Sequence, residues 1–183
     1  MRRKSAFALL LVFVMRPKED LVKGACCGDA RLVRSALRRG SNPDAGYRGR
    51  TVLLWAIQER HFDVVKVLVR ARASLEKRDA KGFTAIDQAV GQGSLKIVEF
   101  LLKSGAKANS RNANGTPLHT ACAWRRLQIA RLLLQHGADP EAFDGDGRKP
   151  IDLMTSTKSA SEKALKKILR RGELPSGRSG QGR

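Results

Sequence analysis

A segment of twelve residues recurs four times along the chain, and its period limits what the chain can fold into. The copies begin at Ala30, Phe62, Leu95 and Leu127, which are 32 or 33 residues apart. In each copy apolar residues cover one broad face of a helix and charged residues occupy the other. Three copies end in glycine, where a helix often needs a left-handed residue, at Gly40, Gly105 and Gly137. The pattern predicts stacked repeats, each burying its apolar face against its neighbours.

A second helix is predicted ahead of these copies, because a threonine recurs before another apolar stretch. The threonines are Thr51, Thr84 and Thr116, spaced 33 and 32 residues apart. Threonine is a favoured N-cap, and Pro117 suits the first helical position, where a missing N–H is harmless. Turn-forming residues, such as Asn42-Pro43-Asp44 and the stretch 144–147, separate the helix pairs.

The stretch Thr116-Pro117-Leu118-His119-Thr120-Ala121, together with the period, resembles the ankyrin repeat. The resemblance implies an all-α solenoid of stacked helix-turn-helix units joined by β-turn fingers. It divides the chain into a cap at 18–46, repeats at 47–79, 80–112 and 113–144, and a C-terminal cap at 145–171. In such repeats Thr116, Pro117, Leu118 and His119 form a structural motif. His119 is therefore expected to bond near its helix start, with the Thr116 hydroxyl as partner, and not to act as a base or metal ligand.

Three arginines depart from the family pattern. Arg60 and Arg125 stand where the family has glycine between its two helices, and Arg72 replaces the glycine that ends its repeat. Holding a residue other than glycine in a left-handed conformation costs about 1 kcal/mol. The repeat at 47–79 is therefore expected to be the loosest internal unit. Alternatively, the three arginines are placed for binding.

The two ends of the chain need separate interpretations. Residues 1–17 contain Arg2, Arg3 and Lys4, then an apolar run at 6–15 that is too short to span a bilayer. This segment is either a targeting signal, with secretion as its consequence, or a cover for the end of the stack. The last helix is expected to bury Ala160, Ala164, Leu165 and Ile168 and to expose Lys163, Lys166, Lys167, Arg170 and Arg171. The basic tail at 172–183 is expected to be disordered.

The chain is strongly basic, with 36 lysines and arginines against 17 acidic residues and a net charge of +19. Such a surface attracts nucleic acid, an acidic protein face or anionic lipid, although it also serves solubility. The positive charge is spread over the repeats as well as the ends, so it does not identify the partner. Three cysteines, an odd number, suit a reducing compartment, and we expect a cytoplasmic or nuclear protein.

The sequence contains no nucleophile motif, phosphate-binding loop or paired carboxylates. Cys26 and Cys27 have no cluster of further ligands nearby, although a metal site needs about four. His119 and Cys122 are spaced for a shared metal, but the repeat assigns both to its scaffold. We therefore expect no catalytic residue, no metal and no cofactor.

Binding is expected on one concave face, because ankyrin-like stacks line that face with their finger tips and inner helices. The residues that register places there are Tyr47, Arg48, Arg50, Gln58, Glu59, Lys81, Phe83, Gln92, Asn114, Trp124, Arg125 and Arg148. Aromatic and arginine side chains are frequent energetic anchors of interfaces. The hypothesis is a monomeric, non-catalytic module that holds an acidic partner protein. The alternative is nucleic-acid or anionic-lipid binding through the basic surface.

Overall fold

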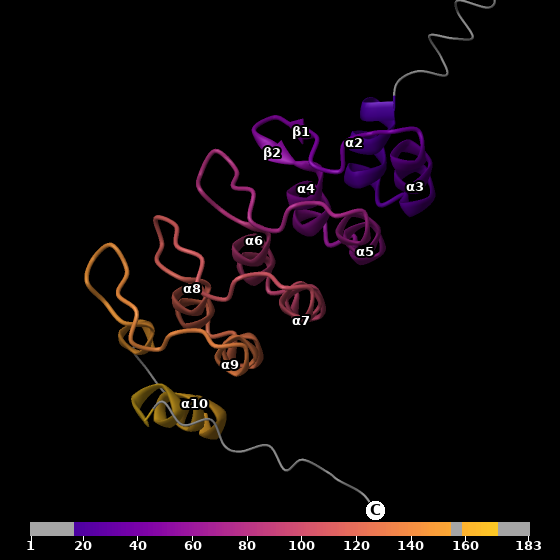
Figure 1. The fold of residues 1–183 in the computed structure, drawn as a ribbon. Helices are drawn as coiled ribbons and strands as arrows, with labels where there is room; N and C mark the ends of the chain where they lie inside the picture. The colour runs from indigo at the N-terminus through magenta and orange to yellow at the C-terminus, as the bar shows by residue number, and fades with distance from the viewer. Residues whose placement is uncertain (1–16, 155–158, 172–183) are drawn as a thin grey trace, which may run out of the picture.

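The chain forms pairs of short helices that follow one another as stacked units (Figure 1). The computed structural model describes residues 17–154 and 159–171, so the expectations for residues 1–16 and for the tail lie outside the described residues. The elements, in chain order, are α2 Pro17–Cys27, α3 Ala30–Arg38, β1 Gly46–Tyr47, β2 Arg50–Thr51, α4 Val52–Gln58, α5 Phe62–Arg70, α6 Ala85–Gln92, α7 Leu95–Lys103, α8 Pro117–Ala123, α9 Leu127–Gln135, the 3₁₀ helix η1 Pro150–Leu153 and α10 Ala160–Arg171.

The helices stack in two columns. The inner column is α2, α4, α6, α8 and η1, and each member contacts the next; the outer column is α3, α5, α7, α9 and α10. Four fingers project from the side of the inner column that faces away from the outer helices (Figure 1). We number them finger 1 (46–51), finger 2 (79–84), finger 3 (112–116) and finger 4 (144–148). The all-α solenoid of helix-turn-helix units predicted from the repeat is confirmed.

The inner helices begin at the predicted threonines because those side chains cap them. Thr51, Thr84 and Thr116 are the N-caps of α4, α6 and α8. In α6 a buried aspartate, Asp87, replaces the motif histidine. It accepts hydrogen bonds from the Thr84 N–H at 2.9 Å, the Thr84 hydroxyl at 2.7 Å and the Ser110 hydroxyl at 3.0 Å. These three donors satisfy a carboxylate that would otherwise be costly to bury.

His119 has the structural role that the motif predicts. The backbone N–H of Thr116 donates to its Nδ1 at 3.1 Å, and the Thr116 hydroxyl lies 2.8 Å from the same nitrogen. The opposite ring nitrogen, Nε2, lies 3.0 Å from the carbonyl of Arg148, which can only accept. Nε2 therefore carries the proton. The fully buried ring closes its own helix start and holds finger 4 against it.

Three arginines adopt the left-handed backbone that their glycine positions require, as predicted. The φ angles are 59° at Arg60, 64° at Arg72 and 54° at Arg125. Two of these side chains bond to the following part of the stack, which offsets the backbone strain. Arg60 Nη2 donates to the carbonyl of Gln92 at 2.5 Å, and Arg125 Nε donates to Glu162 at 2.7 Å. Among the described residues, Arg72 makes no comparable side-chain bond.

The buried stripe of α10 differs from the prediction. Leu165 and Leu169 are fully buried and Ile168 is partly buried, whereas Ala160 and Ala164 are exposed. Glu162 is buried on the same face and forms an ion pair with Arg125 of the preceding repeat. Residues 162, 165 and 169 then share one face at helical spacing. The cap also begins with the short 3₁₀ helix η1 where the repeat has a longer inner helix.

Substitution by glycine should stabilise the protein at Arg72 and destabilise it at Arg70, because, of the two, only Arg72 has a left-handed backbone. Arg72→Gly should raise the free energy of unfolding by up to about 1 kcal/mol, since it removes left-handed strain. Arg60→Gly should gain less, because it also loses the bond to the Gln92 carbonyl. Urea unfolding followed by circular dichroism measures both. The control is Arg70→Gly at the end of α5, which should lower stability by about 1 kcal/mol. An Arg72→Gly variant as unstable as the Arg70→Gly variant would contradict the assignment of strain.

Candidate functional site

Finger 1 is a β-hairpin with a two-residue turn, and Arg48 is the first residue of that turn. Gly46 pairs with Thr51, and Tyr47 pairs with Arg50, in antiparallel register. The intervening residues, Arg48 and Gly49, have φ angles of 49° and 75°, as a tight primed turn requires. Glycine, asparagine or aspartate is the usual first residue of such a turn. An exposed arginine held in a left-handed conformation at a loop tip is a candidate for a functional role.

An aromatic and arginine cluster connects finger 1 to α4. The indole N–H of Trp55 donates to the carbonyl of Tyr47 at 2.9 Å, and the two rings lie 6.1 Å apart. Arg50 lies over the Trp55 ring at 5.5 Å, and Arg48 lies over the Tyr47 ring at 5.2 Å. These cation–π contacts hold the two guanidinium groups on the finger-facing side of the repeat.

Asp79 fixes the position of Arg50 from finger 2. One carboxylate oxygen accepts from the backbone N–H groups of Lys81 and Phe83, at 2.9 and 3.0 Å. The other oxygen lies 3.4 Å from Arg50 Nε. Arg50 also donates to the side-chain oxygen of Gln58 at the end of α4. The buried carboxylate is thereby satisfied, and it holds Arg50 in one place before any partner arrives.

A pocket of about 260 Å³ lies between fingers 1 and 2. We call it the finger pocket, and its lining consists of Arg48, Gly49, Arg50, Trp55, Asp79, Ala80 and Lys81. Three cations and one carboxylate give this lining a charge of +2. Arg50 is paired with Asp79, but no carboxylate of the described chain pairs with Arg48 or Lys81. The pocket therefore presents two available cations beside an indole.

Trp55 was absent from the residues predicted to bind, although the repeat register contains the signal for it. The stretch 51–56 aligns with 116–121, so Trp55 takes the position of Thr120 and Gln88 takes it in the next repeat. The side chain at this position is partly exposed in all three repeats, between buried neighbours. A tryptophan there is not needed for packing between repeats, and this position could have been found from the sequence.

The other predicted residues are distributed along the stack. Phe83, Gln58 and Gln92 are half-buried, and Glu59 and Asn114 are exposed. Trp124, the C-cap of α8, is 68% exposed, with Arg126 lying 5.7 Å from its ring centre. Trp124 is thus an exposed aromatic two repeats away from Trp55.

Two predicted binding arginines are held by carboxylates of the chain itself. Arg125 pairs with the buried Glu162 of α10. Arg148 in finger 4 lies 3.0 Å from Asp144 and 2.5 Å from Asp146. The side-chain hydrogen bond that Arg148 donates to Asp144 raises the pKa of Arg148, and the backbone and side-chain hydrogen bonds donated by Arg148 lower the pKa of Asp144. The structure does not bring either arginine to the finger pocket, and their role in binding a partner stays a prediction.

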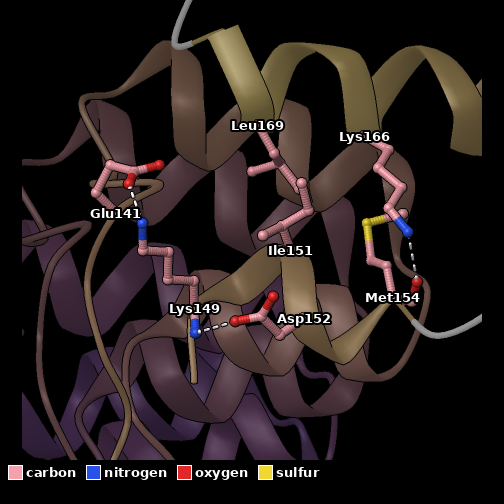
Figure 2. Close-up of a pocket in the computed structure, with 7 residues that line it drawn as sticks. All are labelled: Glu141, Lys149, Ile151, Asp152, Met154, Lys166 and Leu169. Atoms are coloured by element: carbon pink, nitrogen blue, oxygen red, sulfur yellow. Dashed lines mark hydrogen bonds and ion pairs between the residues drawn. The ribbon is translucent and has the colours of Figure 1, made fainter. Parts of the chain in front are cut away.

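A larger pocket, of about 560 Å³, lies at the C-terminal end of the stack, between η1 and α10 (Figure 2). Its polar groups bond to one another. Lys149 Nζ lies 2.5 Å from Glu141, the Lys149 backbone N–H donates to Asp152 at 2.9 Å, and Lys166 donates to the carbonyl of Met154 at 3.3 Å. Ile151 and Leu169 approach each other across the pocket (Figure 2). Because these charges are engaged, the pocket is a weaker candidate for binding than the finger pocket.

The cysteines and histidines offer little reactive chemistry. Burial raises the pKa of the Cys122 thiol to about 12, so it stays protonated at physiological pH. Burial, followed by the neighbouring Cys27, also raises the pKa of Cys26. Within residues 17–154 and 159–171, no group of three or more histidine, cysteine, aspartate or glutamate side chains could hold a metal ion. In the same residues, no helix is long and apolar enough to cross a bilayer.

Comparisons with known proteins agree with the geometry of the repeats. The family profile described as "Ankyrin repeats (3 copies)" matches residues 21–112, and the profile "Ankyrin repeat" matches residues 114–145. The mouse protein phosphatase 1 regulatory subunit 27 is 39% identical over 100 residues, which cover 54% of this chain and 65% of that protein. The mouse RelA-associated inhibitor is 34% identical over 111 residues, covering 58% and 14%. Mouse Rabankyrin-5 is 29% identical over 127 residues, covering 62% and 11%. The chain thus spans less than two thirds of these relatives.

The three cysteines should differ widely in reactivity. With a pKa of about 12 in place of the ordinary 9.0, Cys122 has roughly a thousandth of the usual thiolate at about pH 8. Iodoacetamide should therefore modify the exposed Cys27 first and leave Cys122 unmodified while the chain is folded. Peptide mass spectrometry over time measures the three rates. In concentrated urea all three should react alike, and modification of Cys122 at the rate of Cys27 in the folded chain would contradict its burial.

Proposed function

Because the chain belongs to the ankyrin-repeat family, we propose that it works by holding another protein, with an acidic segment of that partner lying across fingers 1 and 2. The observation that carries this proposal is the finger pocket, in which Arg48 and Lys81 stand beside Trp55 and form no ion pair with any carboxylate of the described residues. The repeats supply a rigid scaffold, and specificity lies in the side chains displayed on it.

The distribution of charge along the fingers favours the N-terminal half of the row. Fingers 1 and 2 carry Arg48, Arg50 and Lys81 against one buried carboxylate, Asp79. Finger 4 carries Asp144 and Asp146, which together outnumber their partner Arg148. An acidic segment is attracted electrostatically to fingers 1 and 2 and is not attracted to finger 4. Such complementarity speeds encounter and sets the register of binding.

The finger pocket also has the features of an energetic anchor. Its cations are positioned in advance, since Arg50 is held by Asp79 and Gln58, and Arg48 is held in a rigid turn. Holding side chains before binding lowers the entropy lost when the partner docks. Tyr47 and Trp55 add aromatic surface beside the charges, and tryptophan, tyrosine and arginine dominate measured interface energies. A longer partner could continue along the inner helices toward Gln92 and Trp124.

The names of two relatives support a role exercised through a bound protein. One is named as a regulatory subunit of protein phosphatase 1, and another as an inhibitor associated with RelA. A role without catalysis accords with the chemistry of the repeats, because their buried histidine and cysteine serve the scaffold. Which protein this chain holds is a matter for the surface residues and not for the shared fold.

The finger-pocket cations should be required for binding and dispensable for folding. The double variant Arg48→Gly/Lys81→Gln should weaken retention of protein partners at least about tenfold, which corresponds to about 1.4 kcal/mol. It should not lower the melting temperature, because glycine accepts the left-handed φ of 49° more readily than arginine. Affinity capture from lysate with quantitative mass spectrometry measures retention, and differential scanning fluorimetry measures stability.

The matched control removes the same charge from α10, in Lys163→Gln/Lys167→Gln. Both lysines are exposed and lie far along the chain from fingers 1 and 2. Proteins lost with the finger variant and retained with the control should be enriched in acidic segments. Equal losses with both variants, or a finger variant that retains every partner, would refute the proposal.

A further inference from the structure

The residue just before each finger occupies the same position of its repeat. These residues are Ala45, Arg78, Arg111 and Phe143, spaced 33, 33 and 32 residues apart. Arg78 Nη1 donates to the backbone carbonyl of Arg111 at 2.7 Å, and Arg111 Nη2 donates to that of Phe143 at 2.7 Å. Each arginine thus bonds to the backbone of its own counterpart in the next repeat. We call these two bonds the arginine ladder.

The arginine ladder connects finger 2 to finger 3 and finger 3 to finger 4. Fingers 1 and 2 are joined in another way. Arg50 of finger 1 pairs with Asp79 of finger 2, and the backbone N–H of Ala80 donates to the carbonyl of Gly49 at 3.3 Å. Each finger is therefore bonded to the next one along the row, and a movement of finger 2 would break bonds on both of its sides.

Finger 2 is also closed within itself, and Arg78 makes one of the closing bonds. Its Nη1 atom donates a second hydrogen bond, to the carbonyl of Gly82 at 2.7 Å. Gly82 has a φ of 80°, and the bond to its carbonyl limits the freedom that a glycine backbone otherwise has. At the start of the finger, Asp79 accepts from the backbone N–H groups of Lys81 and Phe83. Lys81 lies between these two sets of bonds, so its backbone is restricted from both directions.

We propose that Arg78 is a positioning residue for partner binding, which holds Lys81 in place at the finger pocket by bonding finger 2 to the base of finger 3. This role rests on the proposed function, in which an acidic segment binds at fingers 1 and 2. Lys81 is exposed on a loop, and ordering a loop when a partner docks costs conformational entropy. Because Arg78 bonds to carbonyls of the chain itself, that order exists before binding. Arg78 therefore acts on the partner through Lys81 and does not need to touch it.

Hydrogen–deuterium exchange of the full chain, followed by NMR, tests the positioning without any partner. In Arg78→Met, which removes both bonds, the amides of Lys81 and Phe83 should exchange at least about threefold faster, because finger 2 opens more often. The matched control is Arg111→Met, which loses the same charge at the same position of the next repeat and keeps the backbone carbonyl that Arg78 bonds to. Exchange in finger 2 of the control should stay within about twofold of the parent, and the amides of α6 and α7 should keep their protection in both variants.

Fluorescence anisotropy with a labelled peptide of about ten glutamates tests the consequence for binding. Arg78→Met should bind this peptide at least about fivefold less tightly than the parent, and Arg111→Met should bind it within about twofold. A double-mutant cycle then shows whether Arg78 acts through Lys81. The variant Arg78→Met/Lys81→Gln should bind within about twofold of Lys81→Gln alone, since a positioning residue has no further effect once the group that it positions is gone.

Three results would overturn the positioning role and leave the proposed function intact. They are equal losses of peptide binding in Arg78→Met and Arg111→Met, an equal loss from Arg78→Met with and without Lys81, and unchanged exchange at Lys81 and Phe83. A fourth result has a different meaning. A parent chain that binds the glutamate peptide no better than a peptide of glutamines would refute the proposed function, and the positioning role with it.

Discussion

Every unit of this protein depends on its neighbours, because a helix pair of some 33 residues has one apolar face and no partner for it within itself. The cross-repeat bonds follow the same rule. The backbone N–H of Ser74 donates to Asp44 at 2.7 Å, that of Lys107 to Glu76 at 3.0 Å, and that of Asp139 to Asn109 at 2.8 Å. Each bond joins one repeat to the next near the base of the fingers. Packing between repeats therefore arranges the fingers in a row before any partner binds.

The ends of the inner helices opposite the fingers are closed by side chains from neighbouring units. His61 bonds to the carbonyl of Cys26 at 3.0 Å, Arg60 bonds to that of Gln92, and Arg126 bonds to that of Val90. The arginine donors are favourable there because the last carbonyls of a helix are unpaired and carry partial negative charge. Two of the three arginines at glycine positions bond to the next part of the stack, Arg60 to the Gln92 carbonyl and Arg125 to Glu162, whereas Arg72 makes no such bond among the described residues. At Arg60 and Arg125 the side-chain bonds between neighbouring units accompany the left-handed backbone.

The same architecture separates two kinds of surface. Inner helices α4, α6 and α8 are nearly uncharged, so the electrostatics of the finger side there come from a few tip residues such as Arg48 and Lys81. The outer helices carry cations on a face that packing leaves free. The finger pocket and the cations of the outer helices then lie on opposite sides of the stack.

The sequence by itself determined the repeat, the helix starts at Thr51, Thr84 and Thr116, the role of His119 and the left-handed arginines. These features depend on contacts within one repeat period, which a linear pattern records directly. The tertiary structure alone decided which side chains pair across repeats. Glu162 of α10 pairs with Arg125 of the preceding repeat, and Asp79 of finger 2 pairs with Arg50 of finger 1 beside Trp55. Such pairs join residues up to 37 positions apart, and whether they meet depends on the rise and rotation between stacked units, which periodicity does not specify.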